Sequence, residues 1–85
     1  MNRYSCVCIF GFMVQELQLR GDELLLYAYV FAMTQMPDTY CVLDYRKISD
    51  SIGLSYVAID VQLRHLEDKG LIEVKNKQAR AISFD

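Results

Sequence analysis

The segment ISDSIGLSYVAIDVQLRHLEDKGLIEV, Ile48 to Val74, has the strongest structural pattern in the chain, two helical segments with a short break between them. Gly53 can adopt, without strain, the left-handed conformation that ends a helix. Leu54 can fill the angle between two helices, and Ser55 is a good N-cap for a second helix. The segment therefore predicts a helix, a tight turn and a second helix.

The second of these helices has one apolar face and a clear end. Ile59, Leu63 and Leu66 fall at positions i, i+4 and i+7, the spacing of one side of an α-helix. Lys69 places a cation in the last turn, and Gly70 follows as a C′ glycine. We therefore expect a helix over residues 55–69, with its apolar face on the core and the opposite face in solvent.

A β-hairpin is predicted after this helix. Leu71–Lys75 alternates between apolar and polar residues, as a half-buried strand does, and Arg80–Phe84 alternates again. The four residues Asn76–Ala79 are expected to form the turn, although they lack the Asn-Gly pair typical of two-residue hairpin turns.

The upstream half of the chain has a mainly helical pattern. Asp22 is a fair N-cap for a long helix that Pro37 ends, and Asp44 is an N-cap for a helix over residues 45–52. Three shorter elements complete the expected order: a strand or extended arm at Arg3–Phe10, a helical turn at Phe12–Leu19 and a short strand at Tyr40–Leu43. The sequence thus predicts one α+β, mainly helical domain over residues 1–85, with residues 1–20 as an N-terminal arm or extension.

Leu24–Met33 is a run of ten apolar residues. A membrane-spanning helix needs roughly 20, so we expect no membrane segment but a helix that is buried on most of its circumference. With 53% hydrophobic residues in the chain, this helix and Tyr4–Phe10 offer more apolar surface than one small core should bury. The pattern therefore predicts a homodimer, built partly from the N-terminal segment and helix 22–35.

The three cysteines, Cys6, Cys8 and Cys41, lack the spacing of a disulfide framework, and no signal-peptide pattern accompanies the apolar N-terminal segment. We therefore expect reduced thiols in a cytoplasmic protein. A zinc site formed with His65 is not predicted, because the C-x₂₋₄-C spacing of structural zinc sites is absent. No other cofactor is indicated.

No catalytic pattern is present in the sequence. His65 has no recognisable acidic partner or serine motif that would make it a base, and no glycine-rich phosphate loop occurs. The net charge of −2 does not favour nucleic acid, but residues 70–85 hold three bases and two acids, whereas residues 1–43 hold two bases and four acids. The C-terminal end is thus the basic end.

The predicted order of helix, short strand, helix, tight turn, helix and β-hairpin resembles the winged helix-turn-helix family. The match covers roughly residues 44–76 and is carried by Ile48, Ser49, Ile52-Gly53-Leu54-Ser55, Ile59, Leu63, Leu66 and EDKGLIEV at 67–74. Gly11–Gln35 is similar to the opening of small winged-helix proteins of Gram-positive bacteria, their phages and plasmids, some of which are N-terminal domains of replication initiators. The resemblance implies a three-helix core with a short strand and a C-terminal β-hairpin wing.

In that family the second helix of the pair enters the major groove, and the wing touches the backbone or minor groove. The resemblance implies DNA contacts at three groups of positions. They are the helix residues Ser55, Tyr56, Val57, Asp60, Val61 and Arg64, the wing residues Lys75, Asn76, Lys77, Gln78 and Arg80, and the phosphate-binding candidates Arg46 and Lys47.

The exposed helix positions each have two interpretations. Arg64 can bond guanine or a phosphate, or it is a solvated charge near Asp60 or Asp68. Val57 and Val61 can touch thymine methyls or another subunit. Asp60 repels phosphate and accepts only from the cytosine amino group.

We therefore expect a non-enzymatic protein that binds double-stranded DNA, in transcriptional regulation or in mobile-element replication. The alternative is a winged-helix protein–protein interaction module with little DNA affinity. Cations clustered on one face would favour DNA, and interruption of that face by Asp60 and Asp68 would favour a protein partner.

Overall fold

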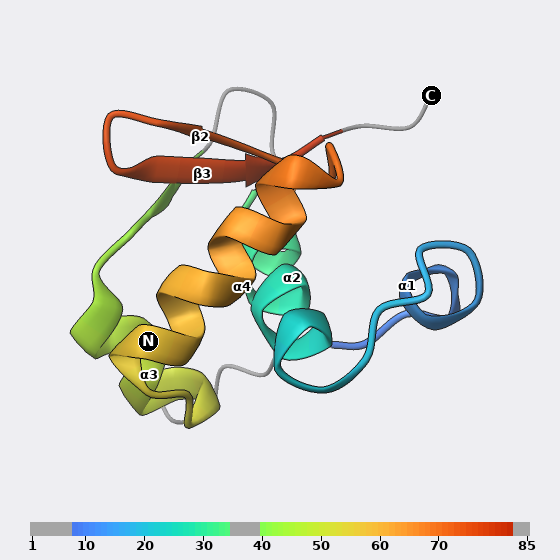
Figure 1. Cartoon of the computed structure of the whole chain (residues 1–85), viewed down its shortest axis with the longest axis horizontal. Coiled ribbons are helices and arrows are strands. Elements are labelled where there is room, and N and C mark those ends of the chain that lie inside the picture. The colour runs from blue at the N-terminus through green and yellow to red at the C-terminus, as the bar shows by residue number, and fades with distance from the viewer. Residues whose placement is uncertain (1–7, 35–39, 83–85) are drawn as a thin grey trace.

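The computed structural model describes residues 8–34 and 40–82 (Figure 1). These residues form four helices, α1 (Gly11–Gln15), α2 (Gly21–Met33), α3 (Tyr45–Ile52) and α4 (Tyr56–Asp68), and three strands, β1 (Cys41–Val42), β2 (Ile72–Lys75) and β3 (Gln78–Ala81). The strands make one antiparallel sheet in the order β1-β3-β2. The predicted α+β, mainly helical class is confirmed.

The turn between α3 and α4 has the predicted form. Gly53 has a left-handed φ of 74°, and Leu54 beside it is 6% exposed. The Ser55 side chain accepts a hydrogen bond of 3.1 Å from the N–H of Ala58, as an N-cap does. At the start of α3, the Asp44 side chain caps in the same way. Local sequence therefore sets this turn.

Helix α2 is the centre of the core. Its residues Leu26–Val30 are all buried, because α1, α3, α4 and β3 all contact this helix. The predicted burial is confirmed, but the predicted N-cap is wrong: Arg20 holds that position, without a side-chain cap, and Asp22 lies in the first turn. Gly21, with a φ of 58°, starts the helix earlier than the N-cap preference indicated.

Helix α4 packs on α2 through the predicted stripe of Ile59, Leu63 and Leu66, all buried. In Figure 1, α4 crosses in front of α2 and ends at the β2–β3 hairpin. The hydroxyl of the buried Thr34 donates to the Val30 carbonyl at 2.8 Å and accepts from the Ala81 N–H at 3.2 Å. This hydroxyl fixes the end of α2 to the sheet.

The hairpin turn is shorter than the sequence indicated. Lys75 pairs with Gln78, so the loop contains only Asn76 and Lys77. Both have positive φ, 52° and 60°, as a type I′ turn requires. The predicted four-residue turn is therefore wrong, and Ala79 belongs to β3, where it is fully buried. Gln78 likewise lies in the strand.

The other short elements differ from prediction in their bounds. β1 is limited to two residues, and the helical turn predicted at Phe12–Leu19 is α1, which begins at Gly11 and ends at Gln15. The prediction for Arg3–Phe10 falls mostly outside the described residues, as does Pro37. None of the described helices combines the length and apolarity that crossing a membrane requires.

Candidate nucleic-acid interface

The face of α4 opposite its buried stripe is exposed to solvent, as predicted. It carries Tyr56, Val57, Val61 and Arg64, which all lie away from the core. Ser55 directs its hydroxyl at the helix N-terminus, so it acts as a cap. The exposed face is thus mainly apolar and aromatic at its start and charged one turn later.

Asp60 is not an isolated carboxylate on this face. The Tyr45 hydroxyl donates to its Oδ1 at 3.1 Å, and Arg64 Nη2 lies 3.1 Å from its Oδ2. Burial, and then the hydrogen bond to Asp60, raise the pKa of Tyr45. The Tyr45 ring also meets Tyr56 edge-on, with ring centroids 6.3 Å apart. Arg64 therefore lies beside Asp60, as one of its two interpretations holds. The hydrogen bond from Tyr45 also links α3 to α4.

The tip of the β2–β3 hairpin, which is the predicted wing, is joined to the segment just before α3. The N–H of Leu43 donates to the Lys77 carbonyl at 2.9 Å. Between them lies an open hollow of about 570 Å³, lined by Leu43, Asp44, Tyr45, Val74 and Lys77. Because Tyr45 also contacts Asp60 and Tyr56, one continuous surface runs from the wing tip to α4. We call the residues Lys77, Tyr45, Tyr56, Val57, Asp60, Val61 and Arg64 the α4–wing face.

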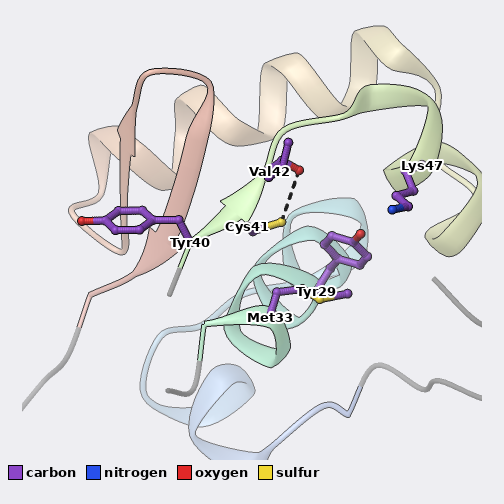
Figure 2. Close-up of a pocket in the computed structure, with 6 residues that line it drawn as sticks. All are labelled: Tyr29, Met33, Tyr40, Cys41, Val42 and Lys47. Atoms are coloured by element: carbon purple, nitrogen blue, oxygen red, sulfur yellow. Dashed lines mark hydrogen bonds between the residues drawn. The ribbon is translucent and has the colours of Figure 1, made fainter. Parts of the chain in front are cut away.

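Two predicted contact residues are placed beside β1 instead. The Arg80 guanidinium carbon lies 5.5 Å from the centroid of the Tyr40 ring, a cation–π contact. Lys47 lines a pocket of about 270 Å³ next to β1 (Figure 2). Arg46, Lys75 and Asn76 are exposed, at the start of α3 and at the end of the wing. Lys47 and Arg80 therefore lie beside β1 and are not part of the α4–wing face.

The pocket in Figure 2 lies between α2, β1 and α3 and is lined by Tyr29, Met33, Tyr40, Cys41, Val42 and Lys47. The Cys41 thiol donates weakly to the Val42 carbonyl, with Sγ 3.7 Å from the oxygen. Burial raises the pKa of Cys41 to about 11. The sulfur is therefore a protonated, unreactive thiol at neutral pH, and the pocket offers no nucleophile from this cysteine.

A group that the sequence did not reveal lies at the opposite end of α4. Glu23 of α2 accepts from Lys69 Nζ at 2.7 Å, and His65 Nδ1 lies 4.0 Å from its other oxygen. The prediction that His65 lacks an acidic partner is wrong, because the partner comes from a helix distant in the sequence. These three side chains link the end of α4 to the start of α2.

Within residues 8–34 and 40–82, no three His, Cys, Asp or Glu side chains lie close enough together to hold a metal ion. Cys6 lies outside these ranges. Comparisons with family models, with curated proteins and with solved structures gave no match to the chain.

Proposed function

We propose that the chain is a non-enzymatic, winged-helix DNA-binding domain, in which α4 lies in the major groove and the wing approaches the backbone. The observation that carries the proposal is the continuity of the α4–wing face. Tyr45 touches α4 through Asp60 and Tyr56, and it borders the hollow below Lys77. One continuous surface therefore presents a helix and a hairpin tip together. Its cellular role would be transcriptional regulation or mobile-element replication.

The charges around this face support binding of phosphate. Lys77 is exposed beside the hollow that Tyr45 lines, and Arg46 and Lys75 are exposed at the start of α3 and at the end of β2. The Asp60 carboxylate has its charge balanced by Arg64 at 3.1 Å. The Asp60 carboxylate is thus paired within the helix, whereas Asp44 is exposed beside the hollow.

A protein-interaction module is the second candidate. It is favoured by the exposed valines on α4 and by the overall charge of −2. Lys47 and Arg80, turned toward β1, also leave fewer cations for DNA. This candidate predicts that charges on the wing are not needed for binding.

Fluorescence-anisotropy titration of a labelled random-sequence duplex at two salt concentrations tests the proposal. Binding should weaken steeply with salt, because each neutralised phosphate contributes about 0.9 to the log–log slope. Lys75→Gln and Lys77→Gln should each weaken binding and lower the slope by about 1. No salt-dependent affinity for any duplex would reject DNA binding and favour the protein partner.

Lys69→Gln is the matched control. It removes the same charge from the same chain, but Lys69 Nζ is held by Glu23 at the end of α4 that adjoins α2. The log–log salt slope of the Lys69→Gln variant should equal that of the wild type. An equal loss in the Lys69 and wing variants would show that net charge, not the α4–wing face, governs binding.

A further inference from the structure

The exposed surface of α4 carries two apolar side chains on one side of the helix. Val57 is 74% exposed and Val61 is 39% exposed. They are four residues apart on one helix, so their side chains lie one above the other on the same face. Tyr56, beside them, is also exposed. This pair offers an apolar contact to a target.

The polar groups next to the valines are already engaged with each other. Both Asp60 oxygens have partners, Tyr45 at Oδ1 and Arg64 at Oδ2. One nitrogen of the Arg64 guanidinium is therefore already paired with the Asp60 carboxylate. A face with these side chains is poorly suited to read bases mainly through hydrogen bonds, so recognition on it depends on apolar contact.

In the major groove the apolar group on a natural base edge is the C5 methyl of thymine, which 5-methylcytosine also carries. We propose that Val57 and Val61 recognise these C5 methyl groups, and that the preferred duplex carries thymines beneath the first two turns of α4. This inference rests on the proposed DNA binding. Lys77 on the α4–wing face, with Arg46 and Lys75 exposed at the start of α3 and the end of β2, supplies the charge complementarity that favours a nucleic acid as its occupant.

Replacing thymine by deoxyuridine tests the inference directly, because it removes the methyl group and keeps the hydrogen-bonding edge. The probes are an alternating A·T duplex and the same duplex with deoxyuridine, each titrated at the same two salt concentrations. Each methyl that contacts a valine should contribute about fourfold in affinity, the value of one buried CH₂ group. Alternating G·C duplexes with cytosine or 5-methylcytosine give a second comparison, in which the methylated duplex should bind more tightly.

The double variant Val57→Ala, Val61→Ala should bind the thymine and deoxyuridine duplexes equally. Both sites are exposed, and alanine favours the helix, so the fold is retained. Val42→Ala, at a 63% exposed valine on β1, is the matched control and should keep the thymine preference.

The outcomes separate this inference from the proposed function. Salt-dependent binding with equal affinity for both duplexes in the wild type would overturn methyl recognition and leave DNA binding in place. A thymine preference that survives in the double variant would also overturn it, because another group would then read the methyl. No salt-dependent binding to any of the four duplexes would overturn DNA binding itself, and the inference with it.

Discussion

The hydroxyl of Tyr45 on α3 donates a hydrogen bond of 3.1 Å to the carboxylate of Asp60 on α4. This contact joins the two helices at their exposed edge, away from the apolar core that holds them at Ile48 and Ile59. The same carboxylate is 3.1 Å from Arg64. Tyr45 therefore sets the position of the charged pair on the α4–wing face.

Tyr45→Phe should destabilise the fold by about 1 kcal/mol, since it removes one hydrogen bond and leaves the ring in place. For a domain of this size, a loss of about 1 kcal/mol lowers the melting temperature by roughly 4–8 °C. Thermal unfolding followed by circular dichroism measures this. An unchanged melting temperature would show that the bond contributes no net stability.

Tyr27→Phe should stabilise the fold, in contrast to Tyr45→Phe. Tyr27 is fully buried in α2, and its hydroxyl finds no hydrogen-bond partner among the described residues. Burial also raises its pKa. Removing an unsatisfied buried hydroxyl removes a desolvation cost of about 1 kcal/mol or more, so the variant should melt at a higher temperature. A destabilised Tyr27→Phe protein would show that the hydroxyl is satisfied in solution.

Features set by local sequence could be predicted, whereas contacts between distant residues could not. The helix-turn-helix was predictable because its signals are local: Gly53, Leu54 and Ser55 act within one turn of where they stand. The Tyr45–Asp60 bond joins residues fifteen positions apart, and the bond from Lys69 to Glu23 joins residues forty-six apart. Such contacts depend on how the helices pack, which residue spacing alone does not give.

The wing was predicted only in outline for a different reason. Its alternation of apolar and polar residues predicts the hairpin, but Asn76–Ala79 lacks strand character, so the sequence alone places the turn there. In the structure, pairing with β1 and β2 holds Ala79 in the sheet. Tertiary pairing thus overrides a weak local preference. The resemblance implies DNA contacts at Lys47 and Arg80 from their positions in the sequence alone. It does not specify that both side chains lie beside β1.

Cys41 should resist alkylation by iodoacetamide at pH 8 in the folded protein and react once the protein unfolds. Burial raises its pKa from 9.0 to about 11, so only about one thiol in a thousand is ionised at pH 8. The exposed Cys8 is the internal comparison. Peptide mass spectrometry after timed labelling distinguishes the two, and equal labelling rates would contradict the burial of Cys41.

The same shift predicts a loss of stability at high pH. Because the folded-state pKa of Cys41 is above the value of 9.0 for the exposed thiol, the folded protein holds this proton more tightly. The contribution of this proton to the free energy of unfolding is fully present below pH 9 and is lost as the pH rises toward 11. Cys41→Ala should flatten this part of the stability–pH curve, measured by urea unfolding at several pH values.

Lys77→Gly should stabilise the fold and weaken DNA binding at the same time. Lys77 has a φ of 60°, which costs a residue with a side chain roughly 1–2 kcal/mol. Glycine removes that strain but makes the unfolded chain more flexible, so a net gain of roughly 0.5–1 kcal/mol is expected. The variant should melt higher yet show a salt slope lowered by about 1. Lys75→Gly, in β2, should lower both stability and slope.

The predicted dimer now has a different basis. The centre of α2 is buried within its own chain, so its apolar length no longer indicates a second subunit. Besides Met33 at the end of α2, exposed apolar side chains lie on and before α1: Ile9, Phe10 and Val14 are each about half exposed. Phe10 is held in place against Phe31, with ring centroids 5.6 Å apart. We propose that two chains associate through these three residues.

Val14→Asp should convert such a dimer to a monomer, because it places a charge in an apolar contact. Since Val14 is exposed in the single chain, the variant should keep its melting behaviour at low concentration. Val42→Asp adds the same charge at an exposed valine on the sheet and should leave the dimer intact. Sedimentation velocity at tens of micromolar measures both, and a monomeric wild type would reject the dimer.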